Sequence, residues 1–301
     1  MLDVEPPVRT AFETARPFDM FSTLAPIGFG PWLRIDRNEV WRATRTPYGP
    51  TTLHLTHSGD RIEVEAWGPG AQWASERAAA LCGEEDDPSG FQPRHGLISD
   101  LHRRHPGLRL TKTGAVFETL VPVVLAQKVT TIEAHKGYRA LVDALGEPAP
   151  GPVRLKIPPP AQVLARTPYW TFHRFGVERR RAEVVIRAAR SAHRLEEITA
   201  MDRDSAYRRL EAFPGVGPWT AAKVALVALG DADAVPVGDY HLPHAVGYAL
   251  DGTARSTDER MLELLTPYRG HRARVIRLLT ISGIAAPRFG PKQPLRNIAK
   301  I

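Results

Sequence analysis

The sequence predicts an α+β fold in which a small N-terminal antiparallel β-sheet domain precedes an all-helical core. Within residues 29–68, apolar and polar residues alternate around Leu53 and Leu55 and around Ile62 and Val64, which is typical of half-buried strands. The rest of the chain shows apolar residues at helical spacing. Strands followed by helices are the order expected of an α+β protein.

Four strands and one helix are expected in the N-terminal unit, and residues 1–28 are expected to be irregular. The strands are Trp32–Ile35, Val40–Thr46, Thr52–Thr56 and Ile62–Trp67, and the helix is Gln72–Leu81. Turn residues at Tyr48–Pro50 and Ser58–Asp60 separate the strands. We assign the tryptophans of this unit to packing, because no chemistry is evident around them.

Helical periodicity marks the core. The expected segments are Leu97–Arg103, Ala115–Leu145 with a bend or start at Pro122, Arg179–Ala192, a helix ending before Pro214, Trp219–Leu229, Tyr240–Leu250, Asp258–Leu265 and Arg272–Ser282. In Arg179–Ala192 the apolar residues are expected to face inward. Its arginines, Arg181 among them, are expected to face outward.

Composition is that of a globular protein with a basic face. The chain has 301 residues, 43% hydrophobic and 24% charged, and it has no apolar run near the ~20 residues of a membrane span. No secretory signal is visible, so a cytoplasmic, nucleoid-associated protein is expected. The net charge is −6 over residues 1–100 and +13 over the remainder. A basic region of this kind is expected of a nucleic-acid surface.

A single cysteine, Cys82, excludes internal disulfides and a four-cysteine iron–sulfur cluster. The sequence also lacks a zinc pattern and a phosphate-binding loop of the nucleotide-hydrolase type. No cofactor is therefore required by these patterns.

The most informative stretch is Leu210–Tyr240. Pro214 ends a helix, and Gly215 and Gly217 then precede an apolar helix that Gly230 ends. Uncovered amides at a helix N-terminus bind anions, such as a nucleic-acid phosphate, a nucleotide or a carboxylate. The alternative is a buried pair of helices whose glycines only allow close approach.

This stretch resembles a known family. Leu-x-x-x-Pro-Gly-Val-Gly-x-x-Thr-Ala, followed by Val-x-x-Asp-Tyr, is similar to the helix–hairpin–helix, Gly/Pro-rich loop and aspartate of the HhH-GPD DNA glycosylases, and within them to the AlkA-like 3-methyladenine glycosylases. The resemblance implies two helical subdomains after an N-terminal domain of residues 1–96. One subdomain is 97–118 with 231–301. The other is 119–230, with the hairpin at about 204–229.

The resemblance implies a monofunctional base excision repair enzyme that flips a damaged purine such as 3-methyladenine out of double-stranded DNA and leaves an abasic site. A monomer is expected. Asp239 would be the catalytic carboxylate, although on the residues alone it is also an ordinary helix cap. The amides of Gly215, Gly217 and Thr220 would bind a DNA phosphate. The carbonyls of Glu211, Phe213 and Val216 would hold a structural Na⁺ or K⁺.

The resemblance also assigns the remaining contacts with DNA. Gln127 and Lys128 occupy the turn that fills the space of the extruded nucleotide, although Gln127 also fits an ordinary polar turn. Trp219 and Tyr240 would wall the base pocket.

Three positions depart from the family pattern. Lys128 replaces an apolar wedge, and Lys223 and Arg277 replace pocket aromatics. Cations at the two pocket positions, Lys223 and Arg277, would repel a positively charged methylpurine, so neutral lesions such as hypoxanthine or ethenoadenine are an alternative. Trp219 stands where strand-cleaving relatives carry lysine, which predicts no abasic-site lyase activity.

Two alternatives from other classes stay open. Helix–hairpin–helix units also serve as non-catalytic modules that bind DNA structure, and Asp239 at the matching spacing argues against this reading. The second alternative is a nucleotide or sugar-phosphate enzyme, which is disfavoured because no strand precedes the glycines.

Overall fold

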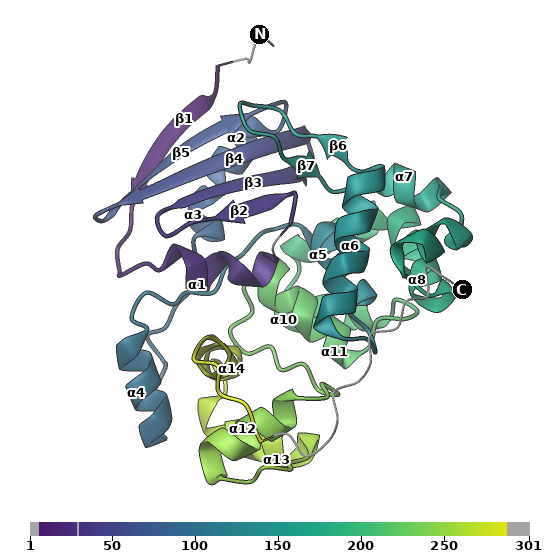
Figure 1. The fold of residues 1–301 in the computed structure, drawn as a ribbon. Coiled ribbons are helices and arrows are strands. Elements are labelled where there is room, and N and C mark those ends of the chain that lie inside the picture. The colour runs from purple at the N-terminus through teal and green to yellow at the C-terminus, as the bar shows by residue number, and fades with distance from the viewer. Residues whose placement is uncertain (1–5, 29, 288–301) are drawn as a thin grey trace.

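The computed structural model describes residues 6–28 and 30–287 (Figure 1). The last part of the predicted segment 231–301, residues 288–301, lies outside this range. Within the described residues no helix is both long enough and apolar enough to cross a membrane.

The predicted antiparallel sheet is present and has five strands, one more than expected. Its order is β1-β5-β4-β3-β2, and every pairing is antiparallel. The strands are β1 (Val8–Glu13), β2 (Leu33–Ile35), β3 (Glu39–Thr46), β4 (Gly49–Ser58) and β5 (Arg61–Trp67). Leu53, Leu55, Ile62 and Val64 are at most 2% exposed, which confirms the alternation that predicted this face.

The expectation of an irregular N-terminus is wrong. Residues Val8–Glu13 form edge strand β1 on β5, and Met20–Leu24 forms α1, which Asp19 caps through the amide of Ser22. Strand β1 has no fully buried residue, so its sequence lacks the alternation that marks the other strands. Strand β1 therefore forms because it pairs with β5, which is a tertiary contact.

The helices follow the predicted order with shifted ends. They are α2 (Ala71–Glu76), α3 (Ala78–Leu81), α4 (Gly96–Arg104), α5 (Val116–Leu125), α6 (Thr131–Leu145), α7 (Ala161–Arg166), α8 (Arg179–Arg190), α9 (Ala192–Glu196), α10 (Arg203–Glu211), α11 (Pro218–Val224), α12 (Leu242–Asp251), α13 (Asp258–Leu265) and α14 (Arg272–Ile281). Shorter helical turns are η1 (Ala25–Ile27), η2 (Tyr169–Phe175), η3 (Glu197–Ala200), η4 (Ala225–Leu229) and η5 (Thr266–Tyr268), and a two-stranded ribbon joins β6 (Glu147–Pro148) to β7 (Lys156–Ile157).

Two hydrophobic clusters organise the elements. The larger runs from the sheet through α5, α6, α8, α10 and α11, so sheet and central helices share one core. The smaller joins α4 to α12, α13 and α14, which Figure 1 shows grouped at the bottom of the molecule. Glu118 of α5 also accepts hydrogen bonds from Arg42 and Thr44 of β3. The predicted domain boundaries stay a prediction.

The outward orientation predicted for one arginine of α8 is wrong. Arg181 is 5% exposed, and its guanidinium donates to the carbonyl of Leu125 at the end of α5. Burial lowers the pKa of this guanidinium. Helical periodicity gives only the average face of a residue, and the free carbonyl at the end of α5 draws this arginine inward.

Candidate functional site

The helix–hairpin–helix is formed by α10, the turn at residues 212–217, and α11 continued by η4. Asp202 caps α10 by accepting from the amide of Ser205 at 3.0 Å. Gly215 has φ +97°, and a Cβ there would lie 2.3 Å from a methyl group of Val184. Both the backbone conformation and the close approach of α8 therefore require glycine. Gly230, at φ 69°, ends η4 as predicted.

The turn presents uncovered donors. Gly215 and Gly217 are exposed, and within the described chain their amides have no hydrogen-bond partner. Pro218 is the first residue of α11, where its missing N–H costs nothing. The turn therefore offers exposed amides and the positive end of a helix dipole to an anion.

The turn at Gln127 meets the hairpin directly. The Gln127 side-chain amide donates to the carbonyl of Gly215 and to the hydroxyl of Thr220, both at 2.9 Å. Next to it, Lys128 is exposed and has φ 57°, the only positive φ of a non-glycine residue in the described ranges. Such a conformation costs about 1–2 kcal/mol. The contact sets this turn beside the exposed amides of the hairpin. Its predicted role in the DNA stays a prediction.

Asp239 lies against the second hairpin helix. Its Oδ2 accepts from the indole Nε1 of Trp219 at 2.8 Å. Its Oδ1 accepts from the amides of His241 and Leu242 at 2.9 and 3.0 Å. Helix α12 begins at Leu242, so Asp239 covers its first amide from three residues before it and is not itself the cap residue. The predicted capping contact is present with this shift.

These contacts keep the carboxylate ionised. Burial raises the pKa of Asp239, but the indole of Trp219, the two amides and the nearby Lys223 lower it more, and the net pKa is below the ordinary value of 3.8. Because Asp239 is only half-buried and both flanking residues are exposed, solvent reaches this site.

Lys223 and Arg277 bring two cations to the same region. The Lys223 ammonium lies 6.0 Å from the centre of the Trp219 ring. Burial lowers its pKa, Asp239 raises it and Arg277 lowers it. Arg277 of α14 donates to the carbonyl of Ser22 at 2.7 Å, its Nε is buried without a partner, and burial lowers its pKa to about 10. The link to α1 was not foreseen.

The other predicted site residues fall nearby or on the surface. Tyr240 is 77% exposed, and its ring contacts His241 and His244 of its own segment, with no recorded contact to Trp219. Its role as a pocket wall stays a prediction. Residues Glu211, Phe213 and Val216 lie in the hairpin, and the Phe213 carbonyl accepts from the amide of Val216. The proposed cation site at these carbonyls also stays a prediction.

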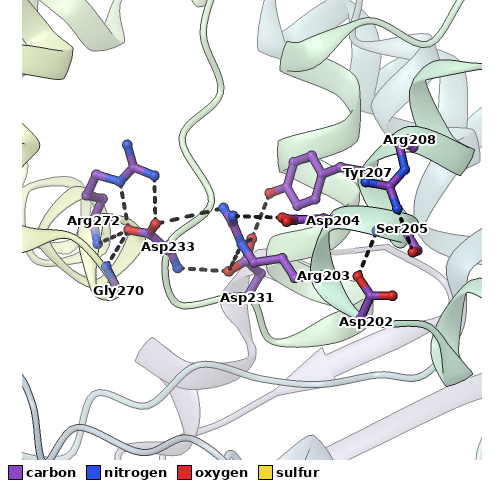
Figure 2. A network of polar contacts seen from close by, with 10 residues as sticks. All are labelled: Asp202, Arg203, Asp204, Ser205, Tyr207, Arg208, Asp231, Asp233, Gly270 and Arg272. Atoms are coloured by element: carbon purple, nitrogen blue, oxygen red, sulfur yellow. Dashed lines mark hydrogen bonds and ion pairs between the residues drawn. The ribbon is translucent and has the colours of Figure 1, made fainter.

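A polar network that the sequence did not reveal holds the loop leading to Asp239 (Figure 2). Asp231 accepts from the Arg203 guanidinium at 3.1 Å and from the Tyr207 hydroxyl at 2.7 Å, both on α10. Asp233 accepts from the guanidinium of Arg272 on α14 at 2.7 and 2.6 Å. The loop is thus tied to the hairpin on one side and to the last helix on the other. Closely spaced acids were visible in the sequence, but their partners were not.

No group of three or more histidine, cysteine or carboxylate side chains suited to a metal ion occurs among residues 6–28 and 30–287. Cys82 is fully buried, and burial raises its pKa, as expected of an inert thiol.

Replacing Trp219 by phenylalanine tests the link between hairpin and carboxylate. Trp219→Phe keeps an aromatic ring but removes the donor to Asp239, so the pKa of Asp239 should rise. Ionised Asp239 contributes stability that is present above its unfolded-state pKa and is lost as the pH falls through the lower folded-state pKa, and the variant should lose part of it. Carboxyl ¹³C NMR titration measures the pKa. Trp170→Phe, on a 63% exposed tryptophan, is the matched control. An unchanged pKa in Trp219→Phe would contradict the assignment.

No family model matches the chain, but curated proteins are similar to it in sequence. The probable bifunctional transcriptional activator/DNA repair enzyme AlkA of Mycobacterium tuberculosis (strain ATCC 25618 / H37Rv) is 30% identical over 218 residues, which are 68% of this chain and 43% of that protein. DNA-3-methyladenine glycosylase 2 of Escherichia coli (strain K12) is 29% identical over 182 residues, 59% of this chain and 62% of that protein. The chain thus spans about half the length of these curated relatives.

Solved structures share the fold. A 3-methyladenine DNA-glycosylase from Archaeoglobus fulgidus matches with a TM-score of 0.78 and 19% identity, covering 91% of this chain and 98% of that one. The Clostridium acetobutylicum 8-oxoguanine glycosylase/lyase, solved with double-stranded DNA, matches with a TM-score of 0.70 and 13% identity over 94% and 98% of the two chains. The predicted combination of N-terminal sheet and helical core is therefore confirmed. With a helix–hairpin–helix bonded to Asp239 and relatives of this kind, the chain belongs to the AlkA-like family of the HhH-GPD superfamily.

Proposed function

We propose that this protein is a monofunctional DNA glycosylase of base excision repair, which hydrolyses the N-glycosidic bond of a damaged purine in double-stranded DNA. The observation that carries the proposal is the Asp239 carboxylate, held ionised 2.8 Å from the indole of Trp219 on the second hairpin helix. A catalytic carboxylate and a phosphate-binding turn then act on one nucleotide. The names of the relatives from M. tuberculosis and E. coli support the same activity.

The chemistry follows from the protonation state. An ionised carboxylate cannot donate a proton to the leaving base, but it stabilises positive charge on the sugar as the bond from C1′ to the base breaks. The base leaves with the bonding electrons, and water adds to C1′ and releases a proton to solvent, which gives an abasic site. Alkylated purines such as 3-methyladenine leave readily because they already carry positive charge. Both oxygens of Asp239 are fixed by hydrogen bonds, so the charge is positioned before the substrate arrives.

DNA binding is assigned to the exposed amides of Gly215 and Gly217 and the first turn of α11, which would contact a backbone phosphate. Carbonyls of Glu211, Phe213 and Val216 could share a monovalent cation with that phosphate. The Gln127–Lys128 turn, bonded to the hairpin, would fill the gap left by the flipped nucleotide with the alkyl stem of lysine. Flipping costs a few kcal/mol, and least for damaged pairs.

Asp239→Asn tests the catalytic assignment. It keeps the size of the side chain and removes the charge, so excision from alkylated DNA should fall by about 10²–10³-fold, while affinity for DNA falls little. Abasic sites are measured by alkaline cleavage under single-turnover conditions, and affinity by fluorescence anisotropy. Asp258→Asn is the control, because Asp258 accepts from the amide of nearby Gly238 without contacting Trp219. Wild-type excision in Asp239→Asn would refute the role. A wild-type protein that binds DNA but forms no abasic sites would instead identify a non-catalytic binding module.

The absence of lyase activity is a separate part of the proposal. The position two residues after Gly217 is Trp219, and its indole is engaged by Asp239, so no amine is available there to form a Schiff base. Lys223 lies one turn further along α11. We expect no strand cleavage without alkali and no covalent protein–DNA adduct after borohydride reduction. An adduct that disappears in Lys223→Met would overturn this expectation and identify Lys223 as the nucleophile.

One observation favours a second substrate class, the neutral lesions hypoxanthine and ethenoadenine. Lys223 lies over Trp219, and Arg277 is close enough to lower its pKa. Two cations beside the base site disfavour a cationic methylpurine, whereas their N–H groups can donate to the ring nitrogens and carbonyl oxygen of a neutral purine.

A panel of lesions in variants of Lys223 tests this alternative. Lys223→Tyr removes a charge and adds an aromatic face, so excision of 3-methyladenine relative to hypoxanthine should rise roughly tenfold. The reason is that repulsion between two like charges about 4 Å apart near a protein surface changes a rate by at least that factor. Lys223→Met, which keeps much of the stem, separates loss of charge from gain of the ring. An unchanged ratio in both variants would show that Lys223 does not select the lesion.

A further inference from the structure

We propose that a cleft between η2 and α8 is a second DNA-binding site, which holds the sugar-phosphate backbone beyond the nucleotide gripped by the hairpin. The inference rests on the proposed function only in taking DNA as the partner, and it concerns residues outside the catalytic site. The cleft is defined by Arg166, Trp170, Arg187 and Arg190, and its volume is about 320 Å³. Residues from the end of α7 and from η2 form one wall, and α8 forms the other.

The cleft carries net positive charge. Arg166, Arg187 and Arg190 are all exposed, and none has a carboxylate partner in the described part of the chain. The one acid in the lining, Glu183, already accepts from the Arg179 guanidinium at 2.7 Å. Three arginines therefore line the cleft, and among the described residues none of them is ion-paired with a carboxylate. Arginine is the side chain best suited to phosphate, because its planar fork donates two parallel hydrogen bonds.

The cleft adjoins the hairpin turn. The Arg187 guanidinium donates to the carbonyl of Pro214 at 3.1 Å, and Gly215, the next residue, packs against Val184 of the same helix. Helix α8 thus lies between the cleft and the exposed amides of the hairpin. In a DNA strand, successive phosphates are spaced ~3.4 Å apart along the axis of the double helix. If one phosphate binds the hairpin amides, the same backbone can therefore continue into the cleft.

An aromatic side chain beside the arginines indicates a sugar or base as well as phosphate. Trp170 is 63% exposed, and its ring meets Tyr169 edge to face at 5.3 Å. Tyr169 is held from another side by the Arg179 guanidinium, 4.6 Å from its ring centre. Aromatic faces interleaved with arginines are typical of surfaces that bind nucleic-acid backbones. An inorganic anion alone would make no stacking contact with the exposed indole of Trp170.

The test is the salt dependence of binding to an undamaged duplex, measured by fluorescence anisotropy. Arg166→Ala/Arg190→Ala removes two phosphate contacts, so the slope of log K against log salt should become less steep by about 1.8. Equivalently, between about 50 and 200 mM salt the wild-type affinity should fall about 12-fold more than that of the variant. Arg187 is left intact, because its contact with Pro214 could shift the hairpin. Arg166→Lys/Arg190→Lys should keep most of the slope.

The matched control is Arg37→Ala/Arg61→Ala, which removes the same charge from exposed residues at the sheet. The control should keep the wild-type slope. Trp170→Ala should lower the affinity without changing the slope, since it removes packing but no charge. Thermal melting of every variant checks folding. The assay needs no excision, so it can be read even if the proposed glycosylase activity fails.

Three outcomes would overturn the inference. The first is a wild-type slope in Arg166→Ala/Arg190→Ala. The second is an equal change in the sheet control, which would show a general effect of charge. The third is an Arg166→Ala/Arg190→Ala variant that binds DNA as the wild type does but is no longer stabilised against heat by inorganic phosphate or a mononucleotide. That result would assign the cleft to a small anion.

Discussion

The hydrogen bond from the Trp219 indole to the Asp239 carboxylate is the contact on which the site depends. It spans 2.8 Å and joins the second hairpin helix to the residue that precedes α12. A half-buried carboxylate is costly unless donors surround it, and here an indole and two backbone amides supply them. The same donors keep the group charged, so the contact that makes burial tolerable also sets the chemistry.

The start of the loop that carries Asp239 is tied to two different helices. Asp231 binds Arg203 and Tyr207 of α10, and Asp233 binds Arg272 of α14. Burial raises the pKa of Asp233, but Arg272 and two backbone amides lower it by more, so the net pKa is below the ordinary value. The loop is therefore anchored by a charged group. These hydrogen bonds connect the hairpin, which packs in the larger hydrophobic cluster, to α14, which packs in the smaller one.

Positive charge is distributed around the site on two scales. Lys223 lies beside Trp219 and Asp239, and Arg277 is close enough to Lys223 to lower its pKa. We propose that these two cations select the base that enters. The exposed arginines Arg187 and Arg190 of α8 line the cleft next to the hairpin turn, where we propose that they contact the DNA backbone. At the cleft, the one acid in the lining, Glu183, is already paired with Arg179, so it does not neutralise the cleft arginines.

The sequence by itself determined the α+β class, four of the five strands, the hairpin with its glycines and the aspartate beyond it, because these follow from local periodicity, proline and glycine chemistry and motif spacing. Only the tertiary structure decided the rest. Strand β1 exists through its pairing with β5, and Arg181 is buried because the end of α5 offers it a carbonyl. The contacts of Asp231, Asp233 and Arg277 join segments from 24 to 255 residues apart. Local sequence does not encode which donor meets which acceptor over such separations, because packing of the two hydrophobic clusters chooses the partners.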